Sequence, residues 1–144
     1  MKRDKACLFA LLSLAGILSL PVQAAGRDAL ATVQHKFDAV NQHDTDAIGR
    51  FYAPDAVLHS PDNPDLSGRA PIADTYRKLF AMIPDARARV VLLERAGDHV
   101  YAQFVMTGHF GGAQDKPVSV RLMSVYTMKN GHIAQDDTYY DRKM

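Results

Sequence analysis

The chain of 144 residues carries 17 lysine and arginine residues against 16 aspartate and glutamate residues, and it contains one cysteine, Cys7. This near balance of charge gives no basis for binding nucleic acid or an anionic membrane surface. The length suits a single domain with one hydrophobic core. Because Cys7 lies in the leader described next, neither a disulfide nor a cysteine ligand is expected in the mature protein.

The first 24 residues are typical of a secretory signal peptide. Three basic residues within the first five positions precede an apolar run from Ala6 to Leu20, and Val22-Gln23-Ala24 supplies a cleavage site. The run is shorter than the roughly 20 residues that a membrane-spanning helix needs, which argues against a permanent anchor. We expect cleavage after Ala24, or else after Ala25. The product is a periplasmic or secreted domain over residues 25–144 that has no membrane association after cleavage.

Helices are predicted in the first half of the domain. From Arg27 to about Gln42, apolar residues recur every three or four positions, as on one stripe of an amphipathic helix. Asp44 is placed to cap a second helix over residues 45–52. Pro71 fits the first turn of a third helix, which Pro84 ends.

Strand patterns make up the rest of the domain. A short apolar run at residues 56–59 predicts one strand, and the Pro/Asp/Asn-rich residues 61–67 predict a loop. Residues 87–95 and 100–110 predict two strands joined by a turn. Helices followed by consecutive strands indicate an α+β fold, in which a curved antiparallel sheet wraps around the N-terminal helices as a cone with an internal cavity.

Residues 118–141 give the strongest pattern, a β-hairpin around Asn130-Gly131. Asn-Gly suits the two positive-φ positions of a type I′ turn, and β-branched and aromatic residues flank it. Alternate residues of a strand share a face, so two rows of side chains should line any cavity. The rows are Val118, Val120, Leu122, Ser124, Tyr126 and Met128 on the first arm, and Ala134, Asp136, Thr138 and Tyr140 on the second.

The inward-facing positions supply the candidate site. Asp136 is the candidate catalytic residue, because a carboxylate drawn into an apolar cone is suited to proton abstraction. The alternative is a solvated acid or the partner of an arginine. The candidate ligand-binding residues are Tyr52, Ser60, Phe104, Met106, Ser124, Tyr126, Thr138 and Tyr140. Tyrosine and methionine at such positions are also common in ordinary cores, and no cluster of histidines and carboxylates indicates a metal or another cofactor.

Several charged or polar residues are expected away from the cavity. Strand alternation places His59 and His109 on the outer face, with Gly108 and Phe110 inward. Asp137, next to the candidate base, is expected at the surface for the same reason. Lys36, on the flank of the first helix, is most simply a solvated lysine with its aliphatic stem on the core.

Short motifs along the chain resemble those of the SnoaL-like family. They are Asn41-Gln-His-Asp44, Phe51-Tyr52-Ala-Pro-Asp-Ala56, Ser67-Gly68-Arg69, Ile83-Pro84-Asp85, and Asn130-Gly131-His-Ile133 followed by Tyr139-Tyr140-Asp141. The resemblance covers nearly the whole mature chain and implies the cone-shaped fold shared with ketosteroid isomerases and nuclear transport factor 2. It also implies a homodimer through the outer face of the sheet, where Val105, Met123 and Val125 offer apolar surface.

The resemblance also allows catalytic positions to be compared. The proton-shuttling carboxylate of ketosteroid isomerases falls at Ser60, and their two oxyanion donors fall at Lys36 and Ser124. The aspartate base and the assisting histidine of the polyketide cyclases fall at Thr138 and again at Ser124. Neither set is present, so steroid isomerisation by that mechanism is not expected. Asp136, on the same strand face as Thr138, is the candidate to replace the missing base.

Two functions remain open at this point. The first is an exported protein that binds a small, mainly hydrophobic organic molecule and transfers a proton with Asp136 as base, without a cofactor. An isomerase, a cyclase or a dehydratase would work in this way. The second is a non-catalytic ligand-binding or protein-interaction module, which the loss of both catalytic sets favours, because one fold hosts many functions.

Overall fold

A computed structural model describes residues 22–61 and 63–140. The elements in chain order are α1 (Val22–Asn41), α2 (Thr45–Arg50), β1 (Tyr52–Ser60), β2 (Asn63–Ser67), α3 (Arg69–Met82), β3 (Arg87–Ala96), β4 (His99–His109), the short 3-10 helix η1 (Phe110–Gly112), β5 (Pro117–Lys129) and β6 (His132–Tyr140). Apart from Val22–Ala24, which begin α1, the predicted signal peptide lies outside the described residues. None of the helices in these two described ranges is long and apolar enough to cross a membrane.

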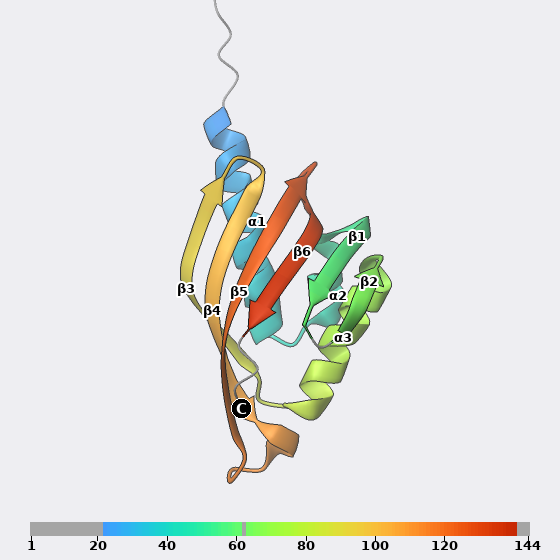
Figure 1. Ribbon diagram of the computed structural model, residues 1–144, viewed down its shortest axis with the longest axis vertical. Coiled ribbons are helices and arrows are strands. Elements are labelled where there is room, and N and C mark those ends of the chain that lie inside the picture. Colours follow the sequence, from blue (N-terminus) through green and yellow to red (C-terminus); the bar gives the residue numbers. More distant parts are fainter. Residues whose placement is uncertain (1–21, 62, 141–144) are drawn as a thin grey trace, which may run out of the picture.

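The six strands form one open sheet in the order β2-β1-β6-β5-β4-β3. This confirms the predicted α+β class and the curved sheet. One strand pair departs from the antiparallel expectation: β1 and β6 run parallel, with Leu58 aligned to Asp136. A parallel pair needs a long connection, and here α3 and the four strands β2, β3, β4 and β5 provide it. In Figure 1, α1 and α2 lie behind the sheet, and α3 lies beside the β1–β2 end.

Helix α1 fills the concave face of the sheet. Val33, Phe37 and Val40 are buried, as the predicted stripe requires, and the ring of Phe37 meets that of Phe104 on β4 edge-on at 4.8 Å. Aromatic rings favour this edge-to-face arrangement. Helix α3 packs against α2 and against β1 and β2, so it reaches the sheet at the end that α1 leaves uncovered.

The region after α1 differs from the sequence prediction in its boundaries. Asp44 caps α2 as predicted, since its Oδ1 accepts a hydrogen bond from the amide of Ala47 at 2.8 Å. The helix ends at Arg50, however, so Tyr52 begins β1 rather than closing the helix, and β1 is longer than residues 56–59. The predicted loop contains β2, which accommodates Pro64 because an edge strand leaves one side unpaired.

The terminal hairpin has the predicted turn and, in most positions, the predicted register. Asn130 and Gly131 both have positive φ, 52° and 76°. Ser124, Tyr126 and Asp136 are all buried, as the inward rows require.

The predicted alternation fails at two places, one in β6 and one at the end of β4. An extra residue in β6 opposite Thr127 and Met128 shifts the register, so Ile133 is buried in place of Ala134. Phe110 was expected inward but is 52% exposed, because the strand ends at His109 and the chain turns into η1.

Candidate functional site

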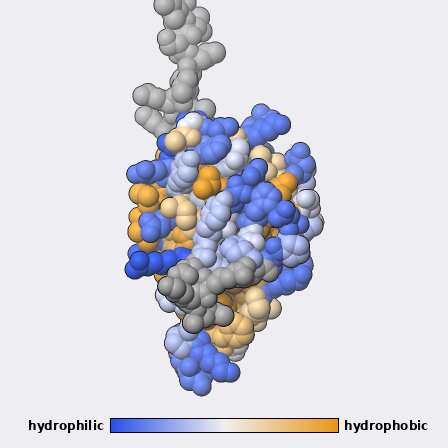
Figure 2. All heavy atoms as spheres, viewed as in Figure 1, coloured by the Kyte–Doolittle hydropathy of each residue, from blue (hydrophilic) through white to orange (hydrophobic). Residues whose placement is uncertain are grey.

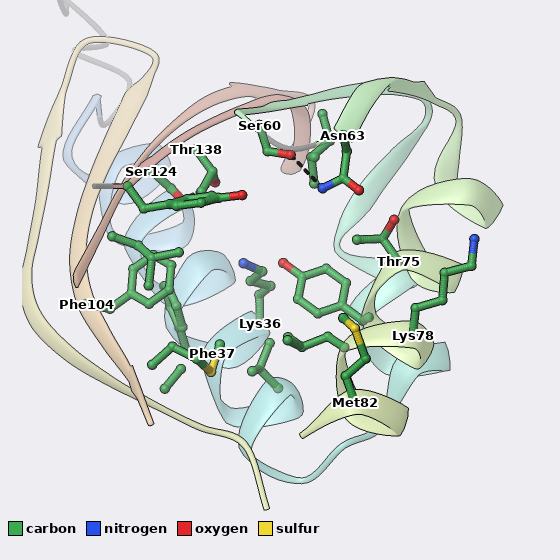
Figure 3. A pocket seen from close by; sticks show the side chains of 18 of the residues that line it. Lys36, Phe37, Ser60, Asn63, Thr75, Lys78, Met82, Phe104, Ser124 and Thr138 are labelled. Atoms are coloured by element: carbon green, nitrogen blue, oxygen red, sulfur yellow. Dashed lines mark hydrogen bonds between the residues drawn. The ribbon is translucent and has the colours of Figure 1, made fainter. Parts of the chain in front are cut away.

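A cavity of about 700 Å³ opens between α1, α3 and the concave face of the sheet. Most of its lining is apolar. The helices contribute Lys36, Phe37, Val40, Thr75, Tyr76, Lys78, Leu79, Ala81 and Met82, and the strands contribute Leu58, Ser60, Asn63, Ala88, Phe104, Met106, Leu122, Ser124, Thr138 and Tyr140. Figure 3 shows Ser124 and Thr138 on the sheet side of this space and Thr75, Lys78 and Met82 on the α3 side.

Most of the ligand-binding residues predicted from the sequence line this cavity. They are Ser60, Phe104, Met106, Ser124, Thr138 and Tyr140. The other two, Tyr52 and Tyr126, are fully buried and lie behind the cavity wall. Arg69 holds Tyr52 in place, since its Nε and Nη2 donate to the Tyr52 carbonyl at 2.9 and 2.8 Å.

Asp136 is buried, with 1% of its surface exposed, rather than solvated. The hydroxyl of Tyr52 donates to its Oδ2 at 2.6 Å, and the hydroxyl of Thr138 donates to its Oδ1 at 2.8 Å. In the described part of the chain no arginine forms an ion pair with it. Its two oxygens are thus satisfied by hydroxyl donors, and Thr138 stands between the carboxylate and the cavity.

Two chains of hydroxyls lead from Asp136 to the cavity, and their polarity is fixed. Thr138 gives its only hydroxyl proton to Asp136, so Ser124, 2.5 Å away, must donate to Thr138. Tyr52 likewise gives its proton to Asp136, so Tyr76, 3.3 Å away, must donate to Tyr52. Ser124 and Tyr76 both line the cavity, and each therefore presents oxygen lone pairs rather than a proton to a ligand.

Lys36 is buried, which corrects the prediction of a solvated lysine. Only 2% of its surface is exposed, and its Nζ donates to the Tyr126 hydroxyl at 2.9 Å. The ammonium also lies 4.6 Å from the ring centre of Phe37, 4.9 Å from that of Tyr126 and 5.3 Å from that of Tyr76. Such contacts with aromatic faces stabilise a cation. Lys36 follows Val33 by three residues and precedes Val40 by four, so its place on the buried stripe was visible in the sequence.

The electrostatics around Lys36 keep it charged. Burial opposes the charged form, but the hydroxyls of Tyr126 and Tyr76 and the carboxylate of Asp136 outweigh it, and the pKa of Lys36 is raised above its ordinary range. Burial, assisted by Asp136, also raises the pKa of Tyr52. Burial raises the pKa of Tyr126 as well, although Lys36 opposes the shift. The cavity wall thus carries a buried cation, Lys36, and the protonated phenols of Tyr52 and Tyr126 lie behind it.

The histidines that were predicted to face outward do so. His59, with its side chain 39% exposed, lies 2.6 Å from Asp137 through Nδ1, and His109 pairs with Asp85 in the same way at 2.6 Å. Asp137 is half-buried by this contact. Across residues 22–61 and 63–140 no group of three or more His, Cys, Asp or Glu side chains is placed to hold a metal ion.

The chain belongs to the SnoaL-like family, because the family model of the SnoaL-like domain matches residues 33–135. These residues run from the buried stripe of α1 into β6 and so include most of the cavity. A comparison with curated proteins gives no match.

Solved structures share the fold over most of the chain. A hypothetical protein from Catenulispora acidiphila with a ketosteroid isomerase-like fold, crystallised with trimethylamine, is 26% identical, with a TM-score of 0.71 over 77% of this chain and 85% of that one. A protein from Jannaschia sp. CCS1, whose name assigns it to the SnoaL-like polyketide cyclases, is 20% identical, with a TM-score of 0.71 over 81% and 87%. An LEH-like epoxide hydrolase from M. tuberculosis is 16% identical, with a TM-score of 0.70 over 81% and 85%. The three neighbours thus share a fold, and the two that bear enzyme names bear different ones.

Proposed function

We propose that the cone binds a small, mainly hydrophobic organic molecule and exchanges a proton with it through Asp136. The apolar cavity of about 700 Å³ lies within the size range of small-molecule sites and carries only a few polar groups. The Catenulispora relative, which holds trimethylamine in its crystal, supports binding of a small molecule. The observation that carries the proposal is the oriented chain from the cavity through Ser124 and Thr138 to Asp136.

The proton would move along this chain in one concerted step. An acidic proton of the ligand passes to Ser124 Oγ, the Ser124 proton passes to Thr138, and the Thr138 proton passes to Asp136 Oδ1. The ligand keeps the electron pair and becomes an anion, while Asp136 becomes neutral. Reversal of the same path returns the proton at a different atom of the ligand, as in an isomerisation. A relay is needed because a hydroxyl alone is a poor base near neutral pH.

A second function, ligand binding without catalysis, is supported by the position of Asp136. Its carboxylate does not line the cavity, and both its oxygens already accept hydrogen bonds from Tyr52 and Thr138. In that case Asp136 would serve to hold β6 against β1 through Tyr52, and the ligand would leave unchanged.

The two functions are separated by hydrogen exchange on the natural ligand. Native mass spectrometry of the purified protein identifies the co-purifying molecule, and proton NMR in D2O follows deuterium uptake at its acidic position. We expect Asp136→Asn to slow catalysed exchange by about 100-fold or more, and Thr138→Val to do the same. The matched control, Asp137→Asn, changes a neighbouring acid on the opposite face and should leave the rate unchanged. If the ligand binds but the protein does not accelerate its exchange, proton transfer is excluded and ligand binding without catalysis is supported.

We also propose that the protein is exported and that it forms a homodimer. Export is supported by the basic and apolar leader before Val22-Gln23-Ala24. Cleavage after Ala24 would shorten α1 by three residues and would leave the buried Ala29, Val33 and Phe37 in place. Intact mass measurement of the protein from its native cell envelope and medium should give a chain that starts at Ala25; a chain that retains Met1 would contradict export by this route.

A further inference from the structure

We propose that Lys36 forms an anion-binding subsite in the cavity and that the ligand is an organic acid, bound through one ionised oxygen with its apolar body along the cavity wall. This inference rests on the proposed function only in assuming that the cavity takes a small molecule. It is independent of whether Asp136 performs proton transfer.

The first support is the unfilled hydrogen-bonding capacity of Lys36. An ammonium has three N–H donors, and within the described residues Lys36 uses one of them, on Tyr126. In Figure 3 its nitrogen lies in the middle of the cavity, facing the space between the sheet and α3. The remaining donors therefore face the place where a ligand would lie.

The second support is charge. In the part of the chain that the structure describes, Lys36 makes no ion pair, and the carboxylate of Asp136 is engaged by Tyr52 and Thr138 instead. The surroundings therefore keep Lys36 charged without a direct ion pair. A ligand with one anionic oxygen would supply that ion pair, whereas an amine cation would meet a like charge.

The third support is the arrangement of the other polar atoms in the cavity. Ser124 and Tyr76 present lone pairs, as their hydrogen bonds to Thr138 and Tyr52 require, so they accept a hydrogen bond from a ligand. Phe104, Met106 and Leu79 supply apolar surface. The cavity thus fits a molecule with one anionic oxygen, one O–H or N–H donor and an apolar body.

A pair of probes that differ only in the head group tests the subsite. We suggest 2-naphthylacetate and its neutral counterpart 2-(2-naphthyl)ethanol, measured by isothermal titration calorimetry on the mature protein at neutral pH. The wild type should bind the carboxylate more tightly than the alcohol by roughly 10- to 100-fold, as for a hydrogen bond to a charged group. Lys36→Met should reduce this preference to within about threefold. Lys129→Met, which removes one exposed charge at the hairpin turn, should preserve it.

A third variant keeps the test decisive if Lys36→Met fails to fold, which circular dichroism would reveal. Tyr126→Phe retains the ammonium and frees one more of its donors, so its preference for the carboxylate should equal or exceed that of the wild type. Wild-type affinity for the alcohol equal to or above that for the carboxylate would overturn the subsite and leave cavity binding intact. Binding of neither probe would overturn the proposed function, and the subsite with it.

Discussion

At the scale of single residues, Tyr52 stabilises the fold both through its ring and through its hydroxyl. Its ring is fully buried in the core, and its hydroxyl donates to the Oδ2 of Asp136 at 2.6 Å. A buried carboxylate that loses one of its donors keeps the cost of desolvation without compensation. The hydroxyl therefore stabilises the folded state by an amount that a change to phenylalanine would reveal.

Tyr52→Phe should lower the free energy of unfolding by about 1–3 kcal/mol, because Asp136 is left with fewer donors. Tyr139→Phe is the matched control, since Tyr139 is 59% exposed, and its effect should stay within about 0.5 kcal/mol. Urea denaturation followed by circular dichroism measures both. Equal effects of the two changes would contradict the described role of the Tyr52 hydroxyl.

A change from glycine to alanine should have opposite effects on stability at Gly108 and Gly49. A Cβ on Gly108 would lie 2.3 Å from Cγ2 of Ile83 and 3.3 Å from Cα of Ala86, so β4 would be pushed away from the turn before β3. Gly108→Ala should cost about 1–3 kcal/mol. A Cβ on Gly49 meets Ala73 at 3.4 Å, an ordinary contact, and Gly49→Ala within α2 should be neutral or stabilise by about 0.5–1 kcal/mol. Thermal unfolding of the two variants checks this contrast.

At the scale of elements, the parallel pair β1–β6 carries an ionisable contact on its outer face. His59 and Asp137 are aligned across the two strands, and Nδ1 of His59 lies 2.6 Å from Oδ1 of Asp137. That hydrogen bond raises the pKa of His59 above its ordinary 6.5. Burial opposes the rise, and the charges of Asp65 and Asp137 add to it. The contribution of this contact to stability should therefore depend on pH.

The sign of the pH dependence follows from the direction of the shift. A group whose pKa is raised on folding contributes its full stabilisation below the unfolded value, about pH 6.5, and loses it as the pH rises through the raised value. Asp137→Asn should thus destabilise the protein more at about pH 5.5 than at about pH 9. It should also lower the pKa of His59 in an NMR titration. A stability difference independent of pH would contradict the link.

The elements that the sequence predicted well are those whose signals are local. The Asn130-Gly131 turn and the stripe of α1 follow from short patterns, and both are present. Strand β2 was missed because Pro64 and its polar neighbours indicate a loop, and only the place of β2 at the sheet edge makes a strand tolerable there. The parallel pairing of β1 with β6 joins segments that are distant in sequence, and no local pattern encodes it.

The candidate site was predictable on the sheet and less so on the helix. Alternation in β5 and β6 brought Ser124 and Thr138 to the cavity as expected. Strand alternation alone could not show that Asp136 lies behind Thr138, since the distance of each side chain from the cavity depends on how the sheet curves. Lys36 was assigned to solvent because lysine is rarely buried, although its spacing from Val33 and Val40 placed it on the buried stripe.

At the scale of the whole molecule, the outer face of the sheet is the surface proposed for dimerisation. Figure 2 shows this face with hydrophobic side chains scattered among hydrophilic ones. Val105, Met123 and Val125 on it are half-buried, and Tyr139 is exposed beside Met123. A second copy would cover these side chains from water.

Size-exclusion chromatography with light scattering should give twice the mass of the mature chain at micromolar concentration. Met123→Asp should shift the mass toward that of one chain, because an unpaired charge in an interface core is costly. Lys116→Asp, at the far tip between β4 and β5, is a control that should leave the mass unchanged. A single-chain mass for the wild type would contradict the dimer.

The pairing of β1 with β6 also determines when, during folding, the sheet and its cavity can form. The wall formed by β1, β2 and α3 is synthesised early, yet it joins the rest of the sheet only along β6, the last strand that the structure describes. Contacts between distant segments form late because a long loop must close first. The cavity can therefore close only after β6 has been synthesised, and a chain truncated before His132 would lack the strand that joins β1 to β5.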